Sequence, residues 1–361
     1  MKTGISLVPG PARRGRRTYE IIGKGRRRRH KPCVYGPCIF PKQTLQRCAR
    51  ELRALLQTAR RRGLDVVADV SPQTAAILGA DSLQPQQLVE LGITTARLDY
   101  GFDVRKTALF SRVMSVQLNA STVQPEYIDA LRDAGAEFSR IDCLHNFYPR
   151  PHTGLSEAFF TAQTARLQQD GLSVGAFIPS QHGRRGPLFE GLPTLEDHRR
   201  LDVSLTARHL AALGVQSVFI GDAQPSDAEL EALAAAGREE KDVVVLKARL
   251  CSREPWIRDF LSYTFTSRLD PSRDMIRTQE SRSHASGSIV RDEACPRRGL
   301  RRGDVTIDTD MYLRYRGEMA IMTADAEDDD KTMIAAQILP EERFLLKYIT
   351  PGRRFRLEFV R

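Results

Sequence analysis

The 361-residue chain has one tryptophan and no apolar run near the roughly 20 residues that a membrane-spanning helix needs. Its first residues contain too short an apolar stretch for a secretory signal and run into arginines. We therefore expect a cytoplasmic protein with no membrane partner. The sequence also has no P-loop, no H-E-x-x-H, no G-x-S-x-G and no dinucleotide fingerprint, which argues against the enzyme classes that these motifs mark.

Cysteines are few and scattered. The six positions are Cys33, Cys38, Cys48, Cys143, Cys251 and Cys295, with no C-x-x-C pair and no Cys/His spacing suited to zinc. Free thiols in a reducing compartment are the simplest interpretation. We expect no metal and no cofactor.

The net charge of +10 belongs to one segment. Residues 1–62 hold 18 Lys and Arg against 2 Asp and Glu, whereas the rest of the chain holds 37 against 43. A nucleic-acid-binding surface would be expected to show basic clusters elsewhere too. We expect no nucleic-acid partner.

Short apolar runs alternate with amphipathic stretches over residues 1–240. The runs are 4–9, 34–40, 64–70, 93–101, 115–121, 138–147, 172–179 and 215–222. Eight strand–helix repeats over about 235 residues are typical of a (β/α)₈ TIM-type barrel, an α/β fold. A doubly wound open sheet is the main competitor, but its glycine-rich first turn is absent.

The pattern changes after residue 240. A strand is predicted over 242–250, and a polar stretch rich in Arg and Ser follows through residue 303. Short β-like runs then continue to the end, with Pro-Gly at 351–352 as a turn. Residues 241–361 are therefore predicted to form a separate, small, mostly antiparallel β-domain.

Residues 10–62 do not show the apolar periodicity expected of a first barrel helix. A polyanion-binding arm and a solvated tail are two interpretations of this segment. We favour a third, that part of it is translated from a shifted frame, because GC-rich codons read out of frame yield Arg, Pro, Gly and Cys. The gene sequence tests this: the idea fails if no single-base shift restores an amphipathic helix and an apolar strand.

Polar residues occupy the predicted carboxyl ends of the barrel strands, where such folds hold their catalytic groups. These are Asp69, Asp99 with Tyr100, Asn119, His145 with Asn146, and Asp222. Carboxylates there suit acid/base or nucleophilic chemistry at a sugar centre. Helix capping is the alternative for Asp69, and for Asp222 through Ser226 and its neighbours. Asp99 has no helix-start pattern behind it.

Two loops are rich in polar side chains that could bind a substrate. Residues 145–160 bring together His145, Asn146, Tyr148, Arg150, His152 and Thr153, which suit sugar hydroxyls, a sugar ring and an anion. Residues 180–199 carry Arg184 and Arg185, suited to phosphate or carboxylate, and Glu190 between glycines and prolines. In the same loop Thr194 is predicted to cap a helix, with Glu196 and Asp197 in its first turn.

Several long motifs resemble the bacterial 6-phospho-N-acetylmuramidase family. In chain order they are LDYGF, LNAST, HNFYPRPHTGLS, RRGPLFEGLPTLEDHR and IGD, followed by FTSRLDPSRDMIRTQESR, GDVTIDTDMYLRYRGEMAI and ITPGRRFRLEF. The match runs from about residue 63 to the end, with GISLVP at the start. The family pattern expects a helix and a second strand over residues 10–62, and this chain departs from it there. The departure puts the activity of this chain in question.

The resemblance implies a cyclophilin-like C-terminal domain and cleavage of the β-1,4 bond of a phosphorylated muramyl disaccharide. Such a muropeptide-derived substrate arrives through a sugar phosphotransferase system, and the products are N-acetylglucosamine and N-acetylmuramic acid 6-phosphate. The implied roles are catalysis by Asp99, Asp222 and Glu190, and substrate binding by Asp69, Asn119, His145, Asn146, Tyr148, Arg150, Thr153, Arg184 and Arg185. The C-terminal domain either covers the barrel mouth with Arg277, Arg282 or Tyr315, or serves only contacts in a homodimer.

Three other functions stay open. A non-catalytic sugar-phosphate binder or surface-associated protein could share the fold, because a fold does not fix a function. A nucleic-acid-binding protein built on the arginine-rich segment predicts salt-sensitive binding. A sugar-phosphate isomerase or aldolase is also possible, although no lysine suited to a Schiff base lies at a predicted strand end.

Overall fold

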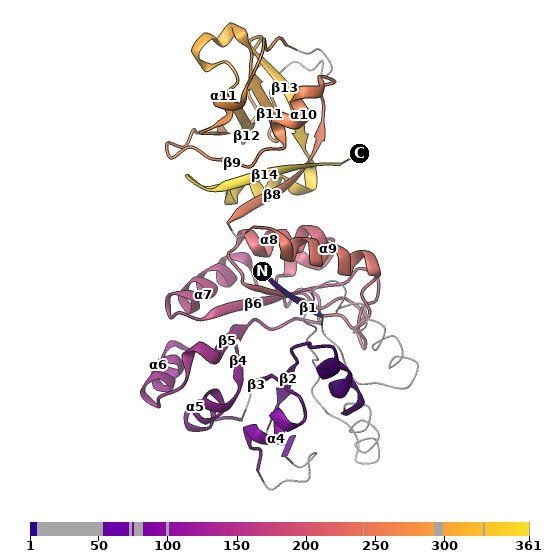
Figure 1. Cartoon of the computed structure of the whole chain (residues 1–361), viewed down its shortest axis with the longest axis vertical. Coiled ribbons are helices and arrows are strands. Elements are labelled where there is room, and N and C mark those ends of the chain that lie inside the picture. Colours follow the sequence, from indigo (N-terminus) through magenta and orange to yellow (C-terminus); the bar gives the residue numbers. More distant parts are fainter. Residues whose placement is uncertain are drawn as a thin grey trace. The chain divides into compact units, whose positions relative to one another are not determined.

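The computed structural model describes residues 1–5, 53–71, 74–75, 82–98, 101–240, 242–291, 299–327 and 329–360. They divide into two compact units. The N-terminal unit comprises Met1–Leu210 with Val215–Glu239, and the C-terminal unit Ala211–Gly214 with Glu240–Arg361. Each carries one seven-stranded sheet (Figure 1).

The first sheet is parallel and curled. Its strands are β1 (Lys2–Ile5), β2 (Val67–Val70), β3 (Thr95–Leu98), β4 (Ser115–Asn119), β5 (Ile141–Leu144), β6 (Ser173–Ile178) and β7 (Ser217–Ile220), in the order β1-β7-β6-β5-β4-β3-β2. Seven of the eight predicted strands are thus confirmed. The eighth, over 34–40, falls outside the described residues. The structure shows a half-barrel with β1 and β2 at its edges, and does not establish the predicted closed barrel.

Side chains alternate between the two faces of this sheet, as the strand period requires. The helices lie on the outer face of the sheet (Figure 1), and strand residues of the parity of Leu98 and Leu118, both apolar, are buried. On the inner face, the register aligns Asp69, Arg97, Gln117 and Asp142 in one row across β2 to β5. The Gln117 amide donates to Asp142 at 2.8 Å. A polar row therefore crosses the concave side of the half-barrel.

The helices between the strands are α4 (Pro85–Glu90), α5 (Val104–Val113), α6 (Pro125–Asp133), α7 (Glu157–Gln169), α8 (Val203–Ala212) and α9 (Asp227–Arg238). Ser156 caps α7, accepting a hydrogen bond from the amide of Phe159. Gly135 and Gly171 follow α6 and α7 with positive φ, where glycine carries no steric penalty. One prediction was wrong: residues 53–61, inside the segment said to lack helical periodicity, are helical and bury Leu55 and Leu56.

The C-terminal sheet is mixed. It consists of β8 (Val243–Leu250), β9 (Phe265–Thr266), β10 (Met275–Arg277), β11 (Asp304–Asp308), β12 (Met319–Met322), β13 (Thr332–Ile338) and β14 (Arg354–Phe359), in the order β10-β12-β11-β13-β8-β14-β9. Five of these six pairings are antiparallel, but β14 runs parallel to β8. Helices α10 (Pro255–Leu261) and α11 (Ser281–His284) and two 3-10 segments, Asp310–Tyr315 and Pro340–Tyr348, complete the unit.

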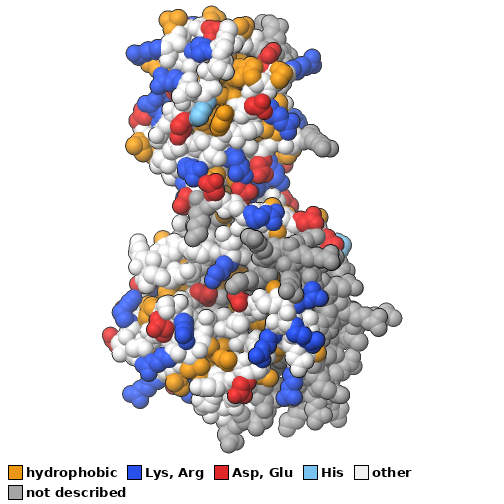
Figure 2. Space-filling model, in the orientation of Figure 1, with side chains coloured by type: hydrophobic (Ala, Val, Ile, Leu, Met, Phe, Trp, Pro, Cys, Tyr) orange, Lys and Arg blue, Asp and Glu red, His pale blue; other side chains and the backbone are white. Residues whose placement is uncertain are grey.

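Three sequence expectations concern the cysteines, membrane-spanning helices and the distribution of charge. Within the described ranges, Cys143 and Cys251 are free thiols, and the other four cysteines lie outside those ranges. None of the described helices is both long and apolar enough to cross a bilayer. Acidic and basic side chains are interspersed on the face of each unit drawn in Figure 2.

Candidate functional site

Arg97 organises the concave side of the half-barrel near the carboxyl ends of the strands. Its buried side chain points inward from β3, with Nε 3.4 Å from Oδ1 of Asp69 on β2. Nη1 donates to the carbonyl of Leu144 at 3.3 Å, and Nη2 donates to the Asn146 side-chain oxygen. Two predicted site residues, Asp69 and Asn146, are thus tied to one guanidinium. Sequence reasoning missed Arg97, although a charged side chain inside an apolar run was a visible signal.

A second guanidinium, that of Arg185, lies over the ring of Phe147 at 4.9 Å from its centroid. Phe147 in turn packs on the inner apolar cluster at Phe177. Burial lowers the pKa of Arg185, while the negative charges of Asp222 and Asp69 raise it. Nη1 is shielded from solvent and makes no hydrogen bond to any residue that the structure describes. Because buried donors are normally paired, this atom is available to an anionic ligand.

Asp222, two residues beyond β7, is fully buried. Oδ2 accepts hydrogen bonds from the backbone amides of Ser180 at 2.9 Å and Leu192 at 3.3 Å, and Oδ1 accepts from that of Arg185 at 2.8 Å. Burial raises the pKa of the carboxyl group, and these amide donors lower it. The predicted cap at Ser226 is confirmed, in a capping box with Glu229, but the Asp222 carboxylate accepts amides of the loop after β6 instead of taking part in it. Asp222 anchors the loop that carries Arg185.

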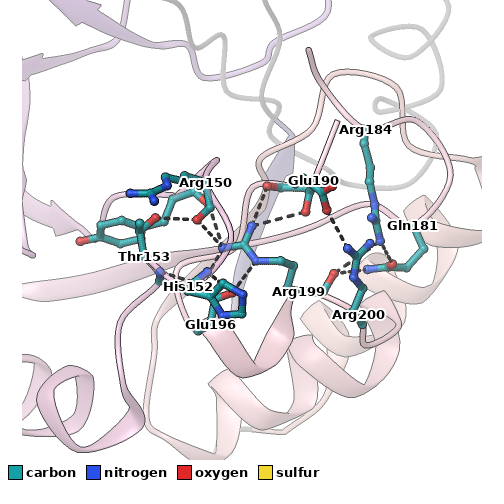
Figure 3. A network of polar contacts seen from close by, with 12 residues as sticks. Arg150, His152, Thr153, Gln181, Arg184, Glu190, Glu196, Arg199 and Arg200 are labelled. Carbon is teal, nitrogen blue, oxygen red and sulfur yellow. Dashed lines mark hydrogen bonds and ion pairs between the residues drawn. The ribbon is translucent and has the colours of Figure 1, made fainter. Parts of the chain in front are cut away.

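An ion pair between Glu196 and Arg199, both in the loop after β6, forms hydrogen bonds to the loop after β5 (Figure 3). The buried Arg199 also donates to four backbone carbonyls, those of Tyr148, Arg150, Glu190 and Gly191. Glu196 accepts from the amides of His152 at 2.9 Å and Gly154 at 2.7 Å. The hydrogen bonds from Arg199 and from these amides lower the pKa of Glu196 to about 2. Sequence reasoning missed Arg199 in its run of polar residues.

The expected helix cap at Thr194 was also wrong. Its buried hydroxyl donates to the carbonyl of Asn146 at 2.8 Å and accepts from the amide of Phe177 at 2.9 Å. The 3-10 turn Glu196–His198 that follows is preceded by Leu195 and has no side-chain cap. Tertiary contacts across β6 therefore determine the conformation of Thr194.

Glu190, Arg184 and Arg150 lie further out on these loops (Figure 3). The Glu190 carboxylate is 35% exposed and pairs with the exposed Arg200 at 2.6 Å. Arg184 donates through Nη2 to the Gln181 side chain and through Nε to the carbonyl of Ser180 at 3.4 Å. Arg150 is exposed, and its carbonyl oxygen accepts a hydrogen bond from the Thr153 hydroxyl at 2.6 Å.

Two of the predicted sugar-binding residues have mainly local contacts. The buried His145 ring packs against Phe160 of α7, with Nδ1 3.2 Å from Ser121 Oγ and Nε2 3.1 Å from Thr164 Oγ1. Burial lowers the pKa of His145 to about 3, so the ring is neutral. Asn119 accepts from the amide of Ser121 at 3.0 Å and shapes the turn after β4.

The structure thus brings Asp69, Asn146, Arg185 and Asp222 into one linked set on the concave side. Tyr148 is half-buried at its edge, where its amide donates to the carbonyl of Pro193 at 2.9 Å. Asp99 and Tyr100 lie outside the described residues. Within the described part of the chain, no group of three or more His, Cys, Asp or Glu side chains is placed to hold a metal ion.

Comparison with known proteins gives the family. The profile described as 6-phospho-N-acetylmuramidase, N-terminal, matches residues 4–235, and its C-terminal counterpart matches residues 244–358. The chain belongs to the 6-phospho-N-acetylmuramidase family. This confirms the resemblance drawn from the motifs.

Two solved structures are similar over the whole length. An uncharacterized protein from B. cereus is 27% identical, with 99% of each chain covered and a TM-score of 0.84. A conserved protein of unknown function from Enterococcus faecalis is 29% identical, with 99% of this chain and 96% of that chain covered and a TM-score of 0.71. None of the curated proteins matches the chain.

Proposed function

We propose that this member of the family is a cytoplasmic glycosidase of cell-wall recycling. It cleaves 6-phospho-N-acetylmuramyl-β-1,4-N-acetylglucosamine to N-acetylmuramic acid 6-phosphate and N-acetylglucosamine. Besides family membership, one observation carries the proposal: Nη1 of Arg185, on the concave side of the half-barrel, is buried and has no hydrogen-bond partner among the described residues.

Arg185 would bind an anionic group of the substrate. A guanidinium offers forked donors that match phosphate or carboxylate, and partial burial strengthens the attraction. Asp222 holds the Arg185 amide at 2.8 Å and so fixes where the side chain starts. Because both Asp222 oxygens accept backbone amides, we assign it the role of positioning Arg185 in place of the catalytic role predicted from the sequence.

Glycoside hydrolysis generally requires two carboxyl groups beside the scissile bond. Asp69 is the candidate that the structure describes, since it is half-buried on the inner face at the end of β2. Asp99 stays the sequence-based candidate for the second. Glu190 pairs with Arg200 on the outer part of its loop, so we place it at the entrance. Asn146 and Tyr148 would bind sugar hydroxyls or the acetamido group.

Incubation with the 6-phosphorylated disaccharide and, separately, with its unphosphorylated form tests the proposal, with products followed by mass spectrometry. We expect cleavage of the phosphorylated sugar alone. Asp69→Asn and Asp99→Asn should each abolish turnover, whereas Arg185→Gln should mainly raise KM. Arg200→Gln is the matched control, because this arginine is exposed and pairs with Glu190.

A folded protein that binds the phosphorylated sugar but cleaves neither form would show a binding protein instead. Equal cleavage of both forms would refute the role given to Arg185. If the chain is inactive, replacing residues 10–52 with the corresponding segment of an active family member would show whether this segment is the cause.

A further inference from the structure

The motif over residues 265–282 in the C-terminal unit is not used by the function proposed above. It contains four arginines, and three of them, Arg268, Arg277 and Arg282, surround one buried carboxylate, that of Glu318. Nη1 of Arg277 lies 3.9 Å from Oε1 of Glu318, and Nε of Arg282 lies 3.7 Å from Oε2. Arg268 is linked to the group through Asp270, which pairs with Arg268 at 2.8 Å and with Arg277 at 2.9 Å.

Hydrogen bonds to the backbone of Met319 fix the segment that carries these charged side chains. The amide of Thr278 donates to the carbonyl of Met319 at 3.2 Å, and the amide of Met319 donates to the Ser281 hydroxyl at 2.9 Å. Both contacts lie next to Glu318 in the chain and fix the segment between Arg277 and Arg282. Gly317 has φ +77°, and a Cβ there would lie 2.3 Å from that of Ala285. Only glycine therefore lets α11 pack this close to Glu318.

The ion pairs in this group are incomplete. Distances of 3.7 and 3.9 Å exceed the 2.7–3.2 Å of an N–H···O hydrogen bond. Oε2 of Glu318 and Nε of Arg277 are shielded from solvent, and neither forms a hydrogen bond with any described residue. A purely structural pair would be expected to close to bidentate contact. The open geometry leaves guanidinium donors for a further acceptor.

An aromatic ring borders the same group. The guanidinium of Arg282 lies 5.9 Å from the ring centroid of Tyr315, and that of Arg314 lies 4.8 Å from it. Tyr315 is exposed, as is Met311 in the same 3-10 segment. Three arginines lie around the two carboxylates of Glu318 and Asp270, and Arg314 lies against the Tyr315 ring, so positive charge is in excess. Asp308 is a third acid, but burial and Glu318 raise its pKa to about 7, so it offsets this charge only in part.

We propose that the C-terminal unit contains a second anion site, in which Arg268, Arg277 and Arg282 bind the phosphate or carboxylate of a saccharide whose ring packs on Tyr315. Guanidinium groups supply planar donors for the anion, and the aromatic face supplies apolar contact for the ring. The site is formed by residues of the C-terminal unit alone and does not depend on glycoside hydrolysis.

Calorimetric titration of the full chain tests the site, with N-acetylmuramic acid 6-phosphate, inorganic phosphate and N-acetylglucosamine as separate probes. All variants are made in an Arg185→Gln background, so that the N-terminal unit does not contribute the Arg185 site. We expect Arg282→Gln and Arg277→Gln to weaken binding of the sugar phosphate at least about tenfold. Tyr315→Ala should weaken the sugar phosphate but not inorganic phosphate. N-acetylglucosamine should bind weakly throughout.

Arg273→Gln is the matched control, because Arg273 belongs to the same motif but is 91% exposed and pairs with the adjacent Asp274. Glu318→Gln should tighten binding of inorganic phosphate, because it removes a negative charge beside the arginines. A misfolded variant would not show this gain in affinity. The proposal is overturned if Arg273→Gln weakens binding as much as Arg282→Gln does. It is also overturned if Glu318→Gln leaves phosphate affinity unchanged or lower.

Discussion

Arg199 and Glu196 form a two-armed ion pair, in which Nε meets Oε1 and Nη2 meets Oε2, each at 2.6 Å. The four carbonyls that Arg199 also contacts belong to the loops after β5 and β6. One side chain therefore fixes the relative position of the segments carrying Asn146 and Arg185. These contacts need several donors in one plane, which an arginine has and a lysine lacks.

Arg199→Lys should accordingly destabilise the N-terminal unit by about 3 kcal/mol, the order found when a buried ion pair is broken. The lysine ammonium cannot reach all of these acceptors, so Glu196 and several carbonyls lose partners. Thermal unfolding of the full chain at pH 7.5 measures the effect. Arg200→Lys is the control, since Arg200 is exposed. Equal melting temperatures for Arg199→Lys and wild type would contradict the assigned role.

Asp222→Ala should loosen the loop over residues 180–192, because the amides of Ser180, Arg185 and Leu192 lose their shared acceptor. We expect a loss of about 2–3 kcal/mol from the unsatisfied buried donors. Cleavage within this loop by a protease of low specificity, mapped by mass spectrometry, should become faster. Asp197→Asn, at an exposed position, is the control. A cleavage pattern identical to that of wild type would show that other contacts hold the loop.

The strands of the half-barrel could be predicted because local sequence determines them. Short apolar runs marked β2 to β7, and the Ser226 position marked the start of α9. Closure could not be predicted in the same way, since it depends on which strand edges meet. The helix over 53–61 was missed because its arginines hide the short apolar stripe of Leu55, Leu56 and Ala59.

The candidate site was harder to predict, because the role of a charged side chain depends on a partner far away in the chain. Asp222 and Glu190 have the same charge and both follow a strand, yet one accepts three buried amides and the other pairs at the surface. Arg97 lies in a strand that otherwise looks like core, and its partners are 28 and 49 residues away. Sequence patterns locate the loops, whereas tertiary contacts decide which groups face a ligand.

The neutral His145 predicts a stability that falls in acid. Its folded pKa of about 3 lies below the ordinary value of 6.5, so below pH 6.5 the unfolded chain takes up a proton that the folded chain does not. The free energy of unfolding should therefore drop by about 1.4 kcal/mol per pH unit from this group as pH falls below 6.5. Above pH 6.5 its contribution is constant.

Denaturant unfolding at pH 7.5, 6.5 and 5.5 tests this. The quantity to follow is the gap in the free energy of unfolding between wild type and His145→Gln. The variant should be less stable at pH 7.5, and the gap should narrow as pH falls. Other titrating groups, Asp308 among them, cancel in this comparison. His182→Gln, at an exposed histidine, is the matched control. A gap that stays constant over this range would show that folding does not lower the pKa of His145.

Asp308 predicts the opposite pH dependence for the C-terminal unit. Burial, together with the charges of Glu318 and Asp329, raises its pKa from 3.8 to about 7, against the hydrogen bond from Thr332. The folded state therefore keeps a proton that the unfolded chain loses above about pH 4. Stability from this group is fully present below pH 3.8 and is lost as pH rises towards 7.

Asp308→Asn removes the cost of ionising a buried carboxyl group, so it should raise the melting temperature at pH 8 and have a smaller effect at pH 5. Asp330→Asn, at an exposed acid, should show no such trend. An equal effect of Asp308→Asn at pH 5 and at pH 8 would show that folding does not raise the pKa of Asp308.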